Sequence, residues 1–187
     1  MEFYDVVKKR RSIRKYKTEA VPRDVILKVL DAACWAPSGG NQQQWEFIVV
    51  SGSKKEQLGE SYAKAMEKMV PDWTEEQRKK AMVNARNFNW APHVIVALTL
   101  KADDPFVQKM HVESVSAAFE NLLLAACVEG LGTCWAMGPL LEEEMVRNIL
   151  GIPSDKEVVA LTPLGYPDME ATAPVRKDLD SKVTWME

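Results

Sequence analysis

Hydrophobic positions along the chain recur either every three or four residues or in short continuous runs. The first clear pattern lies in residues 21–40. There, hydrophobic side chains recur every three or four residues, which places them on one face of a helix. Pro22 suits the first turn of that helix, and Pro37 followed by two glycines ends it. The pattern predicts a helix and then a tight loop, and the buried face of the helix consists of Ile26, Val29, Leu30 and Ala33.

Four more segments have helical patterns. Residues 74–89 open on Thr74 and Gln77, which have the spacing of a capping box. Residues 112–129 are hydrophobic on nearly every side and are followed by a Gly-Leu-Gly stop, which predicts a deeply buried central helix. The remaining two helical patterns cover residues 54–70 and residues 141–151, the second closed by Gly151.

Short runs of β-branched and aromatic residues predict four strands, at residues 45–52, 93–101, 133–138 and 157–165. Because strands alternate with helices, we expect an α/β or α+β sandwich with helices packed over the sheet. A chain of 187 residues suits a single hydrophobic core. The segment after Tyr166 is too polar and proline-rich to join that core, so we expect it to fray unless it docks on another surface.

The composition is typical of a folded protein, with 47% hydrophobic residues, 27% charged residues and a net charge of -3. The acidic balance argues against general nucleic-acid binding. No window approaches the roughly 20 apolar residues of a membrane span, and the N-terminus lacks the order of a secretion signal, so we expect a cytoplasmic protein. Cys34, Cys127 and Cys134 form no CxxC pair and are expected to be reduced thiols. Two histidines are too few for an imidazole-based metal site, so we expect no metal.

Motifs of several other enzyme classes are incomplete. The glycines beginning at Gly130 resemble a dinucleotide-binding turn, but Trp135 occupies the third glycine position and a helix precedes the segment. The chain contains neither a phosphate-binding P-loop nor a nucleophile elbow. We interpret His93 at a strand start, His111 at a helix start and Cys127 on the buried helix as structural residues.

The strongest local signal is the basic segment KKRRSIRKYK at residues 8–17, in which seven of ten side chains are cationic. Alone, such a segment is typical of a solvated helix end or a short nucleic-acid or localisation patch. Three further motifs follow it in order: APSGGNQQQWEFIVV, GLGTCWAMGPL, and TPLGYPD with PVRK near the end. Together with RRSIRKY, this ordered set resembles the FMN-dependent nitroreductase family over almost the whole chain.

The resemblance implies an α+β fold in one domain covering residues 1–187. This fold is an α-β-α sandwich in which helices flank a central, mostly antiparallel sheet. It also implies a domain-swapped homodimer with FMN at the subunit interface. In that dimer the tail at residues 170–187 docks on the partner subunit, and the hydrophobic helix at residues 112–129 is a main interface element.

The resemblance assigns most of the basic residues to FMN. Guanidinium and hydroxyl groups suit a phosphate of roughly -1.5 to -2 charge. The positions that match the family's phosphate site are Arg10, the adjacent Arg11, Ser12, and the pair Arg176 and Lys177 from the tail. Arg14 matches the cation beside N1 and O2 of the isoalloxazine, where a fixed positive charge stabilises the negative charge of the reduced ring.

Other matched positions surround the flavin ring. A loop from the partner subunit covers the ring in the family, and it matches Pro37, Ser38, Gly39 and Asn41. Asn84 matches a side chain at the pyrimidine edge, and Asn87 stands where some members have lysine. Met137 and Gly138 match the stretch whose backbone N–H groups face N5. The chain departs from the family at Gln44, where a proline usually precedes the tryptophan.

The resemblance therefore implies an enzyme that takes hydride from NADH or NADPH by a ping-pong mechanism. The hydride passes to a nitroaromatic, a quinone or a related small-molecule oxidant, and the flavin chemistry requires no acid–base side chain. An alternative is a reductive dehalogenase or flavin-fragmenting branch of the family. We find no equivalent of the lid residues of those branches in residues 60–80, although Trp73 and Trp90 could stack on an aromatic ligand. An alternative of another class is a non-catalytic flavin or nucleic-acid binding protein.

Overall fold

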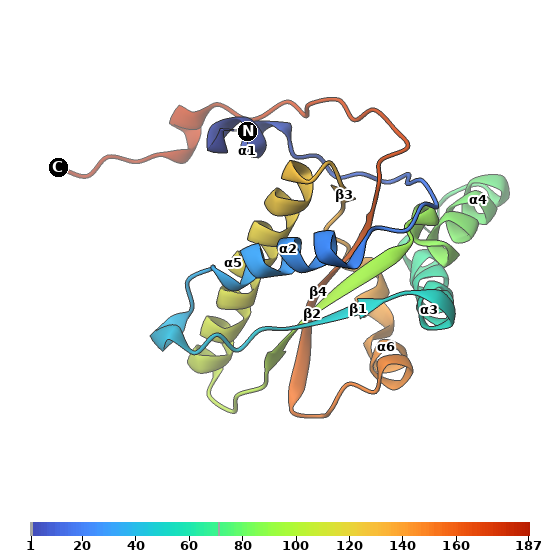
Figure 1. Ribbon diagram of the computed structural model, residues 1–187, viewed down its shortest axis with the longest axis horizontal. Helices are drawn as coiled ribbons and strands as arrows, with labels where there is room; N and C mark the ends of the chain where they lie inside the picture. The colour runs from blue at the N-terminus through green and yellow to red at the C-terminus, as the bar shows by residue number, and fades with distance from the viewer. Residues whose placement is uncertain (1, 71) are drawn as a thin grey trace.

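A four-stranded sheet lies at the centre of the fold in the computed structural model, which describes residues 2–70 and 72–187 (Figure 1). Each pair of neighbouring strands is antiparallel. The spatial order is β1 (Glu46–Val50), β2 (His93–Leu100), β4 (Lys156–Gly165) and β3 (Gly132–Thr133). The predicted α+β class with an antiparallel sheet is therefore confirmed.

Helices cover both faces of the sheet. On one face, α2 (Arg23–Cys34) and α5 (Pro105–Val128) pack against alternate strand residues such as Ile95. On the other face, α3 (Gly52–Met69) and α6 (Glu143–Leu150) pack against the intervening residues such as Val96. Because successive strand side chains point to opposite faces, a strand that is hydrophobic throughout must be covered twice. The three-layer sandwich follows from this pattern.

The remaining helical elements are short or peripheral. Figure 1 shows α4 beside α3 at one end of the sheet, and α1 near the C-terminal tail. The sequence patterns did not predict α1. These elements are α1 (Phe3–Lys9), α4 (Glu75–Arg86) and four 3-10 turns, η1 (Gly39–Asn41), η2 (Phe88–Trp90), η3 (Gly138–Glu142) and η4 (Leu179–Lys182).

The central helix α5 begins earlier than its hydrophobic pattern indicates. Asp104 caps it, because its side-chain oxygen accepts hydrogen bonds from the backbone N–H groups of Phe106 at 2.8 Å and Val107 at 3.1 Å. His111 therefore lies inside the helix, and its predicted place at a helix start is wrong. Its Nδ1 lies 3.1 Å from the Leu100 carbonyl oxygen. The first two turns are exposed or only partly buried as far as Met110, so no buried face marks the true start.

The predicted strand at residues 133–138 is wrong in length, because only Gly132 and Thr133 form the ladder of β3. Beyond them, the backbone N–H of Cys134 donates to the side chain of Thr162 at 2.9 Å instead of to a carbonyl. Ala136 alone rejoins the sheet, through a hydrogen bond of 2.9 Å to the Leu161 carbonyl. The chain then enters η3, so α6 begins at Glu143 and not at residue 141.

The two ends of the chain run side by side at one edge of the molecule (Figure 1). The backbone N–H of Lys17 donates to Tyr166 at 2.9 Å, and that of Asp168 donates to Lys15 at 2.9 Å. Beyond residue 171 every residue of the tail is exposed. Within the described residues, none of the helices is both long and apolar enough to cross a lipid bilayer.

Candidate functional site

A cavity of about 510 Å³ lies between the two paired chain ends, and we call it the cationic cavity. The N-terminal segment contributes three arginines and a serine, and the C-terminal segment contributes a fourth arginine. One carboxylate, that of Glu170, faces these four guanidinium groups, so the charge of the lining is positive. The cavity is lined by Arg10, Arg11, Ser12, Arg14, Met169, Glu170, Ala171, Thr172, Pro174 and Arg176.

Backbone pairing brings these distant residues together. Ser12 forms a parallel bridge with Thr133 of β3, which holds the arginine segment against the sheet. The backbone N–H of Arg14 donates to Met169 Sδ at 3.2 Å. Five predicted phosphate-site residues were expected to converge, and four of them, Arg10, Arg11, Ser12 and Arg176, line one cavity. The fifth, Lys177, is exposed and does not line it.

Ion pairs fix the walls of the cationic cavity. Lys15 Nζ lies 2.6 Å from Asp168 Oδ2, and this hydrogen bond lowers the pKa of the Asp168 carboxyl group. Arg10 Nε lies 3.6 Å from Glu120 Oε1 on α5, which orients that guanidinium group. The basic segment therefore faces a concave site, which differs from the flat cationic surface of a solvated helix end.

A second cavity, also of about 510 Å³, lies along the α3–α4 helical hairpin, and we call it the hairpin cavity. Arg14 lines both cavities and is the residue at which they adjoin. No aspartate or glutamate is among the described residues that line the hairpin cavity. These residues are Arg14, Tyr62, Met66, Met69, Trp73, Gln77, Lys80, Ala81, Asn84, Ala85 and Asn89.

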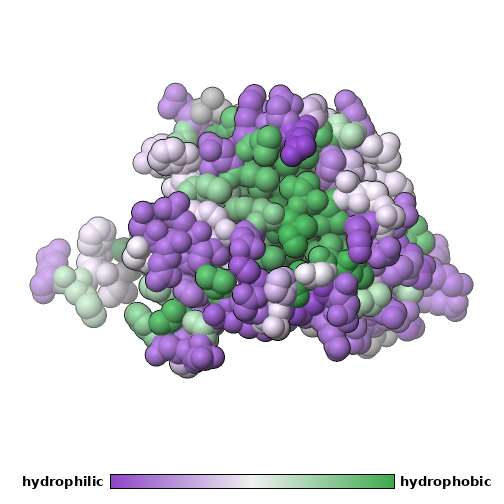
Figure 2. Space-filling view, turned by 60° about the horizontal axis from the view of Figure 1, so that its bottom comes forward, coloured by the Kyte–Doolittle hydropathy of each residue, from purple (hydrophilic) through white to green (hydrophobic). Residues whose placement is uncertain are grey.

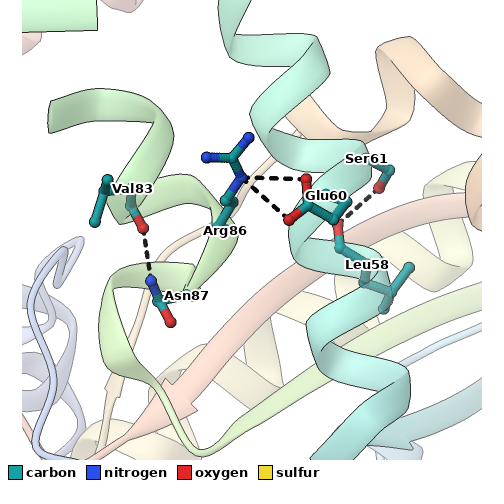
Figure 3. A network of polar contacts seen from close by, with 6 residues as sticks. All are labelled: Leu58, Glu60, Ser61, Val83, Arg86 and Asn87. Atoms are coloured by element: carbon teal, nitrogen blue, oxygen red, sulfur yellow. Dashed lines mark hydrogen bonds and ion pairs between the residues drawn. The ribbon is translucent and has the colours of Figure 1, made fainter. Parts of the chain in front are cut away.

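The base of the hairpin is tightly closed (Figure 3). Gly59 of α3 packs directly on the Arg86 carbonyl group, and a Cβ at Gly59 would overlap that oxygen. Arg86 Nε pairs with Glu60 Oε1 at 3.1 Å, so the Glu60 carboxylate is turned to Arg86. Asn87, which stands where some family members have lysine, donates through Nδ2 to the Val83 carbonyl at 2.8 Å. This amide is therefore occupied within its own helix.

The start of α4 follows the sequence prediction closely. The Thr74 side chain accepts from the Gln77 N–H at 3.3 Å, and Gln77 Oε1 accepts from the Thr74 N–H at 3.0 Å. Both hydrogen bonds of the predicted capping box are thus present. The cap fixes the end of the hairpin that carries Trp73.

Gly138 lies beside the hairpin cavity. A Cβ on Gly138 would come within 2.9 Å of the Tyr62 ring and 3.1 Å of Met69 Sδ, both of which line that cavity. Burial raises the pKa of the Tyr62 hydroxyl group, so it stays protonated at neutral pH. Met137 is half exposed, and its sulfur accepts from Trp135 Nε1 at 3.2 Å. Asn84 and Gly138 therefore gather at the hairpin cavity with Arg14.

The loop at residues 37–41 lies elsewhere in this chain. The Gly39 N–H donates to Ser114 Oγ at 3.3 Å, and Gly39 packs against Met110. Ten helical residues, about 15 Å at 1.5 Å per residue, separate Met110 from Glu120, the ion-pair partner of Arg10. Within a single chain, neither cavity includes the predicted loop residues Pro37, Ser38, Gly39 and Asn41.

Gln44, the departure from the family pattern, is buried. Neither side-chain amide atom has a hydrogen-bond partner within the described residues. A buried amide without partners is destabilising by about 1 to 3 kcal/mol. The site next to Trp45 is therefore polar where proline would be apolar.

Sequence reasoning missed most of the hairpin cavity. Tyr62, Met66 and Met69 have the spacing i, i+4 and i+7, which places them on one face of α3. That stripe predicts a hydrophobic face on α3, but nothing in it distinguishes a cavity wall from core packing. Trp73 was noted as a residue able to stack on an aromatic ligand, and it lines the cavity.

Comparisons with known proteins agree with this architecture. The sequence profile of the nitroreductase family matches residues 7–166. A Bacillus subtilis protein with a provisional assignment as an NAD(P)H nitroreductase is 30% identical over 184 residues, covering 97% of this chain and 93% of that protein. An iodotyrosine deiodinase of Thermotoga neapolitana is 30% identical over 172 residues, covering 88% of each chain.

A solved structure extends the comparison to three dimensions. It is an oxidised iodotyrosine deiodinase bound to FMN and 3-iodo-L-tyrosine, with 26% identity and a TM-score of 0.78. The match covers 94% of this chain and 95% of that chain. Given the family profile, the full-length relatives and the shared fold, this chain belongs to the nitroreductase family.

Proposed function

We propose that the protein is an FMN-dependent oxidoreductase that uses NADH or NADPH to reduce small organic acceptors. The observation that carries this proposal is the cationic cavity, which adjoins the hairpin cavity at Arg14 in a chain of the nitroreductase family. When bound, FMN supplies the hydride-accepting and hydride-donating chemistry, and the protein supplies binding and orientation. The family relatives described as NAD(P)H nitroreductases support the choice of electron donor.

The lining of the cationic cavity suits the phosphate of FMN. Guanidinium groups and a hydroxyl donate directed hydrogen bonds to phosphate oxygens. We assign the phosphate to Arg10, Ser12 and Arg176, with Arg11 beside them and Lys177 next to Arg176 in the chain. The position of Arg14 at the junction of the two cavities supports its assignment to the ring. There its charge stabilises the anionic reduced state.

Residues at the hairpin cavity would then face the ring and the acceptor. Asn84, which lines this cavity, would offer a donor and an acceptor to the pyrimidine edge, and the backbone N–H groups of Met137 and Gly138, beside the same cavity, would face the N5 side. No side chain is assigned as a general acid or base. The side chains would bind and orient the flavin and the acceptor, and the apolar wall would exclude water from the site of hydride transfer.

We further propose a homodimer with one domain per chain, residues 1–187. The loop carrying Pro37, Ser38, Gly39 and Asn41 lies apart from both cavities of its own chain, so a partner subunit is its proposed destination. Large hydrophobic side chains exposed on the monomer support an interface, and Figure 2 shows hydrophobic residues gathered over one face. Tail residues 170–187 also dock on the partner in this proposal, since Val175 and Trp185 are 100% and 84% exposed, while Arg176 lines the cationic cavity of its own chain.

Reductive dehalogenation is a second candidate function. The similarity to the Thermotoga neapolitana iodotyrosine deiodinase, 30% identical over 172 residues and 88% of its length, favours it. A halogenated phenol would occupy the same hairpin cavity as a nitroaromatic acceptor. The two activities would share this site and differ in the bond that is reduced, which is N–O in the nitroaromatic and carbon–halogen, with release of halide, in the phenol.

The test begins with the purified protein. It is expected to carry or take up FMN, to show flavin absorbance, and to bleach anaerobically on addition of NADH or NADPH. Re-oxidation by a nitroaromatic, a quinone or a halogenated phenol then ranks the candidate acceptors. A protein that neither retains nor takes up FMN would overturn the proposal.

A further inference from the structure

We propose that the hairpin cavity selects aromatic acceptors that carry a carboxylate, and that Lys80 pairs with this carboxylate. The inference rests on the proposed function for the identity of the reaction, but it concerns the acceptor alone. It distinguishes this chain from relatives named for an amino-acid substrate.

The walls of the cavity suit a flat ring. Tyr62 and Trp73 offer aromatic faces and edges, and Met66 and Met69 offer polarisable thioethers that adapt to an aromatic ligand. Gly138 borders this wall at Tyr62 and Met69, so the ring-binding wall is continuous with the stretch proposed to face the flavin. An aromatic acceptor therefore has a wall to pack on next to the reacting centre.

The charges of the cavity favour an anion. Arg14 and Lys80 are the two cations among its lining residues, and no carboxylate is present among them. Lys80 makes no ion pair in the part of the chain that the structure describes, whereas the adjacent Lys79 pairs with Glu75 at 2.8 Å. With Arg14 assigned to the flavin ring, Lys80 is the cation left for the acceptor.

Two nearby acids are paired with other cations. Glu60 is paired with Arg86 at the base of the hairpin, and Glu75 is paired with Lys79, both of which line a different cavity. An amino-acid substrate would bring an ammonium group that finds no carboxylate among the described lining residues, and an unpaired charge is costly to desolvate. A simple aromatic acid carries no such group.

Gln77 adds a fixed donor to the same wall. Its Oε1 is held by the Thr74 backbone N–H at 3.0 Å, so its orientation is set and its Nε2 remains a donor. Together, Lys80 and Gln77 lie one helical turn apart on α4, at i and i+3. This pair matches the two oxygens of a carboxylate better than a neutral amide.

The experiment measures equilibrium binding to the oxidised FMN-loaded protein without NAD(P)H, so that nothing turns over. Calorimetry compares 4-nitrobenzoate with its neutral isostere 4-nitrobenzamide. We expect the acid to bind about 1.4- to fivefold more tightly, because an exposed ion pair contributes about 0.2 to 1 kcal/mol. Lys80→Gln should remove this preference, Lys80→Arg should retain it, and the control Lys79→Gln should leave it unchanged.

A second pair of probes tests the amino-acid group. The protein should bind 4-hydroxy-3-iodobenzoate more tightly than 3-iodo-L-tyrosine, and added salt should narrow the advantage of the acid over the neutral amide. Three results would each overturn the proposal. The first is equal affinity for the acid and the amide. The second is an equal loss of the preference for the acid in Lys80→Gln and Lys79→Gln, and the third is tighter binding of 3-iodo-L-tyrosine than of 4-hydroxy-3-iodobenzoate. If FMN is retained in those cases, the oxidoreductase assignment stands. A protein that takes up no FMN overturns both.

Discussion

The cationic cavity and the hairpin cavity have the same volume, about 510 Å³, but they are built in opposite ways. The cationic cavity joins residues 10–14 to residues 169–176, which lie at opposite ends of the chain. The hairpin cavity takes all its lining except Arg14 from residues 62–89. One depends on long-range strand pairing and charge, and the other on a local helix pair and apolar side chains.

This difference suggests that the two cavities have different roles, one in holding the phosphate and the other in selecting the acceptor. A phosphate anchor needs several cations held in fixed positions, which the paired chain ends provide through hydrogen bonds such as Asp168 N–H to the Lys15 carbonyl at 2.9 Å. Acceptor selection needs a wall that can vary without disturbing the sheet, and a peripheral hairpin provides one. Arg14, which lines both cavities, is where the two properties meet.

The largest expected effect removes two arginines from the cationic cavity. Each charge-assisted hydrogen bond is worth about 1.5 to 3 kcal/mol, so Arg10→Ala combined with Arg176→Ala should weaken FMN binding by about 100-fold or more. Fluorescence titration of the apoprotein with FMN measures the change. Lys8→Ala is the matched control, because Lys8 is an exposed member of the same basic segment that does not line this cavity. An equal loss in the control would show that only overall charge matters.

The next effect concerns the hairpin alone. Gly59→Ala places a Cβ against the Arg86 backbone carbonyl, which cannot move aside as a flexible side chain would. Overpacking of this kind lowers the free energy of unfolding by about 1 to 3 kcal/mol. Urea denaturation compares it with Lys64→Ala at an exposed site on the same helix. If the variant is no less stable than the control, the close contact between α3 and α4 is not as described.

A smaller change loosens the other end of the hairpin. Thr74→Ala removes the N-cap of α4 and should lower the free energy of unfolding by about 1 kcal/mol. Thr74→Ser keeps the hydroxyl group and should stay close to the unmodified protein. FMN affinity should change little in either variant, because the phosphate is assigned to the cationic cavity, which contains no part of α4, and Thr74 lies ten residues, about 15 Å of helix, from Asn84. A large loss of FMN in Thr74→Ala would mean that the two cavities are not separable.

The smallest effect tests the tie between the chain ends. Lys15 lowers the pKa of Asp168, so this pair stabilises the fold at neutral pH, and the contribution is lost as the pH falls through the lowered pKa. Asp168→Asn should therefore reduce the free energy of unfolding slightly at pH 7. The gap to the unmodified protein should narrow below about pH 4, near the ordinary aspartate pKa. Denaturation at pH 7 and pH 3 measures the difference in free energy of unfolding at each pH. A difference that is larger at pH 3 than at pH 7 would contradict the stabilising role of the Lys15–Asp168 pair.

Much of the fold could be predicted from the sequence where local pattern and burial agree. The strand at β2 is hydrophobic at successive positions, and the capping box at Thr74 specifies the start of α4. The prediction was wrong where the local pattern and the burial disagree. The first turns of α5 are exposed or only partly buried, because Asp104 and Pro105 start the helix before it reaches the core. The run after Thr133 resembles a strand, although its backbone bonds partly to the Thr162 side chain.

The sequence by itself determined most of the long helices and strands, the family resemblance and which residue types were available to bind an anion. Only the tertiary structure decided that Arg176 joins Arg10 around one cavity and that the loop at Gly39 does not. Helices and strands follow from interactions between residues a few positions apart, and a sequence displays these directly. A site shared by residue 10 and residue 176 depends on which strands pair and on where the two chain ends lie side by side. That geometry is fixed by the packed sheet as a whole.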